Sequence, residues 1–203
     1  MSSKLKQELK DVFGLSLSKP CKELDAKKLF VKGGISVIAS LAGVGKTTFM
    51  LSEKKIWESI GYSVSYVNCD SSPTIEPDLI ESPSNLSDVD RMFTIIKKCA
   101  TRDDIIIIDS LKAMASYCGY DIENNHNMYE LMLKLRTIVK ETNCSIILVH
   151  HVYEAKNLRN PPINLYGSRA IEEQSDSSFI YQKDKVKIVK SRLGYSREEI
   201  VLI

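Results

Sequence analysis

The sequence has few of the features that mark secreted, metal-stapled or membrane-spanning proteins. Its five cysteines are scattered with no C-x-x-C pair, and an odd number without metal-ligand spacing is typical of reduced intracellular thiols. No apolar run reaches the roughly 18 residues that a spanning helix needs, and the lysine-rich N-terminus has no apolar signal core behind it. We therefore expect a cytoplasmic protein that does not associate with a membrane.

The chain also lacks a strong charge of either sign. A formal net charge of +2 is too small to indicate nucleic-acid binding and too small to exclude it, so any basic surface must be local. Charged residues make up 27% and hydrophobic residues 43%, which is an ordinary globular mixture. The 203 residues suit one domain with a sizeable core.

The most informative stretch of the chain is 40–48. It follows an apolar run at 35–39, which predicts a buried strand, and it precedes helix-compatible sequence from about Gly45. A strand, a glycine-rich turn and a helix in this order are the context of a phosphate-binding loop. We predict that the nucleotide is bound by Ala42, Gly43, Val44, Gly45, Lys46, Thr47 and Thr48.

The chemistry of this loop follows from its residue types. Backbone N–H groups and the helix N-terminus attract the phosphates, Lys46 adds a mobile positive charge, and the hydroxyl of Thr47 suits Mg²⁺. Glycine at 43 and 45 permits the tight curl of the backbone. The strict pattern has glycine where this chain has Ser40, a departure that leaves the tight part of the loop intact. The chain is therefore expected to bind a nucleoside triphosphate.

Hydrophobic patterning predicts strands that alternate with helices. Strands are expected at about 62–69, 105–108, 145–149, 178–181, 185–190 and 199–203, and helices at about 45–60, 87–100, 127–142 and from 168. A hairpin is expected at 29–35, a looser region at 112–126 and a mobile loop at 153–167. The fold class is therefore a three-layer α/β structure with a mainly parallel sheet and antiparallel strands at its C-terminal edge.

Polar residues stand where the predicted parallel strands end. Asp70, Asp109 and His151 each follow an apolar strand, and ligands bind beyond the carboxyl ends of such strands. Asp109, after four isoleucines, suits the acidic residue that holds Mg²⁺, although a solvated aspartate at a strand end is the alternative. His150 and His151 are adjacent on a strand and point to opposite faces, so a shared zinc ion is disfavoured.

Residues 1–20 form a predicted amphipathic arm before an ATPase domain at 21–203. Leu5, Leu9, Val12 and Phe13 share one helical face. The arm either folds back on its own domain or docks on a neighbouring subunit.

Several signatures together resemble the RecA-like ATPases. They are the loop at 40–48, the strand Ile105–Ser110, the pair His150–His151, the run Gly167–Arg169 followed by Asp176, and Lys190–Arg192. Within that group, the resemblance is to the hexameric replicative helicases of the DnaB type and their plasmid- and phage-encoded RepA-type relatives. The resemblance covers about residues 24–203.

This resemblance implies a role for each matching residue. Asp70 would polarise the attacking water, where the family usually has glutamate, and His151 would sense the γ-phosphate. Lys190 and Arg192 would reach the nucleotide of a neighbouring subunit. Independently of the resemblance, two cations at a spacing of two project from one face of a strand. Solvated charges on an edge strand are the alternative.

The resemblance also implies a DNA-binding surface. The segments 112–126 and 153–167 correspond to loops that face a central channel and touch single-stranded DNA, where Lys156, Arg159 and Arg169 would contact phosphates. A loop that is merely solvated is the alternative. Aromatic stacking partners are few, and Tyr153 and Tyr166 are the candidates.

The expected function is that of an ATP-hydrolysing, Mg²⁺-dependent homo-oligomer that acts as a DNA helicase or translocase. The resemblance implies that this oligomer is a ring. Two rival functions remain open. The first is an ATP-dependent regulator or loader without unwinding activity, which the lack of a further domain favours. The second is a small-molecule kinase, which would need an arginine-rich lid that the sequence does not clearly mark.

Overall fold

The computed structural model describes residues 15–16, 28–59, 61–70, 89–154, 163–183, 185–192 and 199–201. The strands are β1 (Leu15–Ser16), β2 (Lys28–Phe30), β3 (Ile35–Ser40), β4 (Val64–Asn68), β5 (Ile105–Asp109), β6 (Ser145–Glu154), β7 (Ile163–Leu165), β8 (Ser177–Tyr181), β9 (Lys185–Ser191) and β10 (Glu199–Val201). The helices are α2 (Lys46–Ser59), α3 (Val89–Arg102), α4 (Leu111–Tyr117), α5 (Asn125–Thr142) and α6 (Arg169–Gln174).

The main sheet has eight strands, seven of which lie in the order β10-β9-β8-β3-β6-β5-β4, while β7 pairs with β6. Every neighbouring pair from β8 to β4 is parallel. In contrast, β9 and β10 pair in antiparallel fashion at one edge. The predicted fold class is confirmed by this arrangement.

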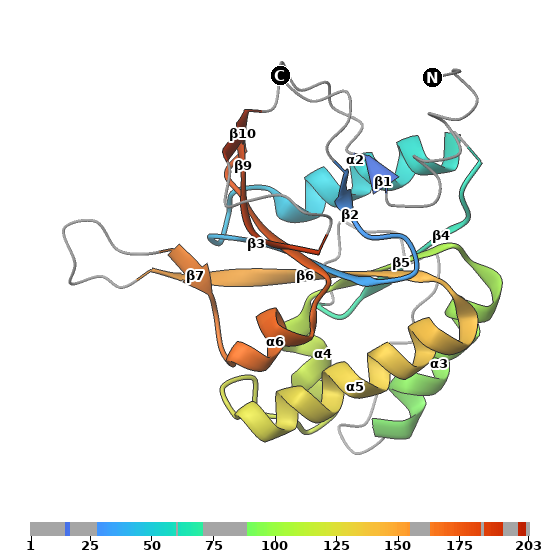
Figure 1. Ribbon diagram of the computed structural model, residues 1–203. Helices are drawn as coiled ribbons and strands as arrows, with labels where there is room; N and C mark the ends of the chain where they lie inside the picture. Colours follow the sequence, from blue (N-terminus) through green and yellow to red (C-terminus); the bar gives the residue numbers. More distant parts are fainter. Residues whose placement is uncertain are drawn as a thin grey trace.

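The sheet has helices on both faces (Figure 1). Helix α2 lies on one face, and α3, α4, α5 and α6 lie on the other. The isoleucines of β5 explain the double cover, because Ile105 and Ile107 pack in the core under α2 while Ile106 and Ile108 pack in the core of the opposite layer. Among the helices described, none is long and apolar enough to cross a membrane.

The hairpin predicted at 29–35 is wrong. Strand β2 pairs with β1 in a separate two-stranded sheet, whereas β3 lies between β6 and β8 in the main sheet. The amide of Val31 instead donates to the hydroxyl of Ser36 at 3.0 Å, so the turn is closed by a side chain. Of the arm expected at 1–20, the structure describes only the two residues of β1.

Two segments expected to be loops contain regular structure. Residues 111–117 form α4, because the hydroxyl of Ser110 accepts a hydrogen bond from the amide of Ala113 and caps the helix. In the segment 153–167, β6 continues to Glu154 and pairs in antiparallel fashion with β7. Residues 155–162, where Lys156 and Arg159 lie, are outside the described part of the chain.

Candidate nucleotide site

The predicted phosphate-binding loop connects the end of β3 to the start of α2 at the carboxyl edge of the sheet. Gly43 and Gly45 have φ angles of 77° and 94°. Apart from its chain neighbours, a Cβ atom at either position would meet none of the described residues within 4 Å. The backbone conformation, and not crowding, therefore requires glycine at both positions.

The side chain of Lys46 is folded over this loop. Its Nζ donates to the carbonyl oxygens of Ser40 at 3.2 Å and Leu41 at 3.3 Å. The residue is buried. Burial lowers the pKa of Lys46, and the nearby carboxylates of Asp109 and Asp70 oppose that shift.

Thr47 and Asp109, the predicted metal ligands, lie in direct contact. The hydroxyl of Thr47 donates to Oδ2 of Asp109 at 2.7 Å. A hydroxyl has one proton and two lone pairs, so this hydrogen bond leaves the lone pairs of Thr47 available to a cation. Hydroxyl and carboxylate oxygens are ligands that Mg²⁺ accepts. The residues present therefore fit a magnesium ion.

Tyr66 is a third member of this cluster, and the sequence analysis missed it. Its hydroxyl donates to the same Oδ2 of Asp109 at 2.6 Å. Burial, and next the charge of Asp109, raise the pKa of the phenol well above its usual range. Tyr66 therefore stays protonated and remains a hydrogen-bond donor.

Asp70 follows β4 and lies beside the end of β5. The amides of Cys69 and Asp70 both donate to the carbonyl oxygen of Asp109, at 2.5 Å and 3.2 Å. The hydroxyl of Ser110 donates to Oδ1 of Asp70 at 2.8 Å. Ser110, which the sequence analysis did not single out, therefore joins the carboxylate of Asp70 to the first turn of α4.

His151 is level with the end of the strand that leads to the loop, because it pairs with Ser40 across β6 and β3. Burial, and next the positive charge of Lys46, lower the pKa of His151. His150 is fully buried and its Nε2 lies 2.6 Å from the carbonyl oxygen of Tyr166. Within the described ranges, no three His, Cys, Asp or Glu side chains are grouped to hold a metal ion.

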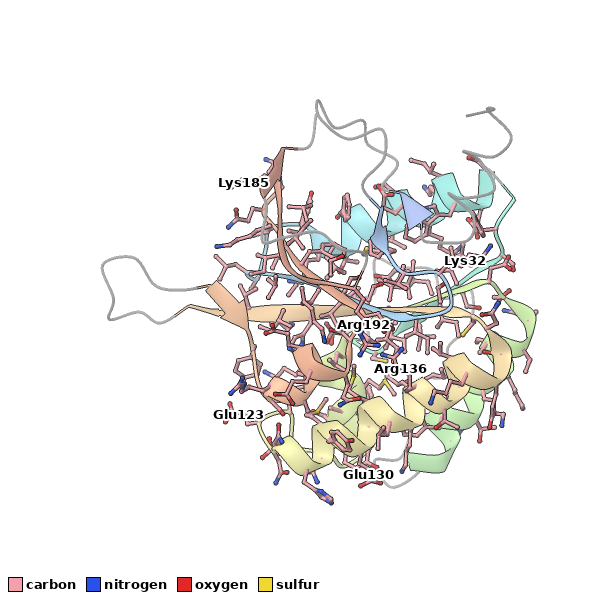
Figure 2. All side chains as sticks on the ribbon, in the orientation of Figure 1. Lys32, Glu123, Glu130, Arg136, Lys185 and Arg192 are labelled. Carbon is pink, nitrogen blue, oxygen red and sulfur yellow. The ribbon has the colours of Figure 1, made fainter. Side chains whose placement is uncertain are left out.

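Lys190 and Arg192 lie near the amino ends of the parallel strands, on the side of the sheet opposite the phosphate loop. The amide of Arg192 donates to the carbonyl of Asp176, and the amide of Asp176 donates to the carbonyl of Ile35 at the start of β3. Since β3 has six residues, Arg192 lies on the order of 17 Å from the phosphate loop. Figure 2 shows Lys185 and Arg192 at the two ends of β9.

Both of these basic side chains contact their own chain. Nζ of Lys190 donates to the carbonyl oxygens of Glu172 and Glu173 at the end of α6, at 2.7 Å and 2.8 Å. Nη1 of Arg192 forms an ion pair with Oδ1 of Asp176 at 2.8 Å, yet 58% of its side chain is exposed. Arg136 binds the other oxygen of Asp176, and Figure 2 shows the two guanidinium groups close together.

Arg169 is the first residue of α6, and its side chain is 90% exposed. It lines a pocket of about 580 Å³ whose other residues are Glu123, Leu165, Tyr166, Gly167, Ser168 and Glu172. The hydroxyl of Tyr166 donates to Glu123 at 2.6 Å, and the ammonium of Lys112 lies 5.5 Å from the centre of its ring. The ring of Tyr166 is therefore held in place beside Arg169.

A second pocket, of about 390 Å³, adjoins the phosphate loop. Its lining is mainly apolar and comprises Leu41, Val44, Val152, Ile180, Tyr181, Gln182 and Lys185.

A phosphate loop after a central parallel strand, with antiparallel strands at one edge, defines a RecA-like P-loop ATPase fold. The chain is similar to the crystal structure of the RadB recombinase, with a TM-score of 0.62, 17% sequence identity and coverage of 90% of this chain and 93% of that one. It is also similar to a KaiC-like protein from the hyperthermophilic archaeon Pyrococcus horikoshii OT3, with a TM-score of 0.59, 20% identity and coverage of 86% and 91%.

At the level of sequence, the family model described as an AAA domain matches residues 67–156. No curated protein matches the chain. At 17–20% identity the solved structures establish the fold, and the DnaB or RepA type of helicase stays a prediction.

Proposed function

We propose that this protein binds ATP with Mg²⁺ and hydrolyses it. The observation that carries the proposal is the hydrogen bond of Thr47 to Asp109 directly beside Lys46 in the loop. It places a hydroxyl, a carboxylate and an ammonium at the N-terminus of α2, where phosphate and a divalent cation bind together in P-loop proteins.

Each residue of the site has a proposed role. Lys46 would leave the carbonyl oxygens of Ser40 and Leu41 and bind the β- and γ-phosphates. Magnesium would neutralise phosphate charge, held by Thr47 and, directly or through water, by Asp109. Asp70 would orient the attacking water, and His151 would contact the γ-phosphate. The apolar pocket beside Leu41 and Val44 would accept the nucleobase.

We further propose that the protein works as a homo-oligomer in which each nucleotide lies between two copies. Arg192 lies at the edge of the sheet opposite its own phosphate loop, so it cannot serve its own site. In a head-to-tail contact, the side of one copy that carries Arg192 meets the side of the next copy that carries the phosphate loop. Repetition of this contact builds a ring or a filament. In such a contact Lys190 and Arg192 would reach the neighbour's γ-phosphate.

Single-stranded DNA is the proposed substrate of the oligomer. Arg169 and the pocket beside Tyr166 support this part, because an exposed arginine beside a fixed aromatic ring suits a phosphate and a base. Lys156 and Arg159 would add phosphate contacts. The bond between His150 and Tyr166 joins this surface to the strand that carries His151, and it would link the nucleotide site to bound DNA.

The test measures ATP binding, phosphate release and mass in solution, each with and without oligo-dT. Lys46→Ala should abolish nucleotide binding, whereas Lys55→Ala on the exposed face of α2 should bind as the parent does. Equal ATP affinity in Lys46→Ala and the parent would remove the phosphate-loop assignment.

The alternative function is an ATP-dependent regulator or loader that does not unwind DNA. The likeness to a recombinase and to a KaiC-like protein favours it over a helicase, because neither of those proteins is named as a helicase. Strand-separation measurements on a forked duplex distinguish the two. A regulator would hydrolyse ATP and leave the duplex intact, whereas a helicase would separate it only with ATP.

A further inference from the structure

Tyr66 donates a hydrogen bond from its phenol hydroxyl to the proposed metal ligand Asp109. Among the described residues, it is the one tyrosine that does so. The tyrosine lies on β4 and the aspartate on β5, 43 residues further along the chain. The two strands are parallel neighbours, with Asn68 opposite Asp109. Tyr66 is 3% exposed and packs in the apolar cluster under α2.

A phenylalanine would fill the same space in this cluster. The phenol hydroxyl is therefore what distinguishes Tyr66 from an ordinary core residue, and a buried hydroxyl is costly unless it finds a partner. Here the partner is a carboxylate, which makes a stronger hydrogen bond than a neutral acceptor does. The hydroxyl therefore lies within hydrogen-bond distance of the proposed metal ligand Asp109.

The two donors on Asp109 meet at one oxygen. Oδ2 accepts from Thr47 at 2.7 Å and from Tyr66 at 2.6 Å. A carboxylate oxygen offers about two lone-pair sites, so Oδ2 is fully used. The two bonds come from different elements, α2 and β4, and they fix the carboxylate plane from two directions. The second oxygen, Oδ1, would then serve the cation or its water.

We propose that Tyr66 is a positioning residue for the metal site: it anchors Oδ2 of Asp109 so that Oδ1 is presented to Mg²⁺. This inference rests on the proposed function, because it concerns the cation that accompanies ATP. The proton of Thr47 gives the carboxylate one hydrogen bond, and the phenol of Tyr66 supplies the second. Partners of metal ligands typically contribute about 10- to 100-fold in metal affinity or activity.

The test is an equilibrium titration of the full chain with Mg²⁺ in the presence of a fluorescent ATP analogue. In Tyr66→Phe the half-saturating Mg²⁺ concentration should rise about 10-fold, while the affinity for the analogue in EDTA stays at the parental value. Tyr120→Phe is the matched control. Tyr120 lies in the connection between α4 and α5, and its hydroxyl bonds Glu130 and Lys134 of α5, away from the site. It should titrate as the parent does.

A purely structural role for the hydroxyl gives a different result. It would lower the thermal midpoint of Tyr66→Phe and leave the Mg²⁺ midpoint unchanged, which overturns the proposal. A parent chain that binds the analogue neither with Mg²⁺ nor in EDTA would overturn the proposed function itself, and this inference with it.

A second measurement uses the unaltered chain and does not depend on the variant's folding. The hydroxyl proton of Tyr66 is buried and bonded, so it should give an NMR signal protected from exchange. Mg²⁺ added to the nucleotide complex should shift this signal, whereas nucleotide in EDTA should not. A signal that does not respond to Mg²⁺ would overturn the proposal.

Discussion

The hydroxyl of Ser110 donates a hydrogen bond to Oδ1 of Asp70 over 2.8 Å and, with the same oxygen, accepts one from the amide of Ala113. The serine thus caps α4 and orients the carboxylate that we propose to position water. A single side chain therefore links the fold of α4 to the proposed hydrolysis.

Ser110→Ala should separate these two tasks. We expect phosphate release to slow about 10- to 100-fold, because a displaced water-orienting group loses its alignment, while ATP affinity changes little. The lost cap should reduce the free energy of unfolding by about 1 kcal/mol. Asn124→Ala removes the cap of α5 away from Asp70, so it should lose similar stability and retain the parental rate. Parental turnover in Ser110→Ala would show that Asp70 is positioned without the serine.

The strand ends of this site could be predicted from the sequence because the signals are local. Apolar blocks such as Ile105–Ile108 mark buried parallel strands, and parallel strands bring their carboxyl ends to one edge. On that basis the sequence predicts that Asp70, Asp109 and His151 lie together. The phosphate loop is recognisable for the same reason, since its strand, turn and helix are contiguous in the chain.

Contacts between distant residues could not be predicted in this way. Tyr66 reads as one apolar position in an alternating strand, and only the register of β4 against β5 brings it to Asp109. The ion pair of Arg136 with Asp176 joins residues 40 apart. Strand β7 exists through its pairing with the end of β6, because three residues are too few for a periodic signal.

The buried imidazole of His150 should make the stability of the fold depend on pH. Burial lowers the pKa of this imidazole to about 4; the hydrogen bond with the carbonyl of Tyr166 opposes that shift, and the charges of His151, Lys46 and Lys112 add to it. The pKa of His150 in the folded state lies below the ordinary value. Between about pH 6.5 and pH 4, His150 is therefore protonated in the unfolded chain but neutral in the folded chain. The free energy of unfolding should fall by about 3 kcal/mol over that interval on account of this residue.

Urea unfolding of the parent and of His150→Gln at pH 7, 6 and 5 measures this effect. Glutamine retains an N–H donor for the carbonyl of Tyr166 but does not titrate, so the variant should lose less stability on acidification. His126→Gln is the control, because His126 lies exposed at the start of α5. An equal acid loss in His150→Gln and the parent would contradict the assignment.

The proposed DNA surface predicts a change in salt dependence. Replacement of both Lys156 and Arg159 by alanine should weaken single-strand binding at all sequences alike. It should also flatten the dependence of log K on log salt by about 0.7 for each phosphate that the variant no longer neutralises. Lys55→Ala combined with Lys98→Ala removes the same charge from α2 and α3 and should leave the slope unchanged. Identical slopes in both double variants would mean that the segment 153–167 does not touch DNA.

Arg192 predicts shared catalysis between copies. Arg192→Ala should bind ATP nearly as the parent does and hydrolyse it about 10³-fold more slowly, because an arginine supplied across an interface stabilises transition-state charge. The fold should survive, since Asp176 retains Arg136 and the amide of Ile35. Lys187→Ala, on the same strand β9, should remain active.

Mixing Arg192→Ala with Asp70→Asn tests the direction of the contact. Each variant alone lacks one half of every site, but a boundary that combines the intact Asp70 of one copy with the intact Arg192 of the next is complete. Random co-assembly of equal amounts makes about a quarter of the boundaries complete, so about a quarter of parental turnover should return. Recovery should require assembly and disappear on dilution. Co-assembled mixtures that remain inactive would show that Arg192 acts through Asp176 in its own chain, as a structural ion pair.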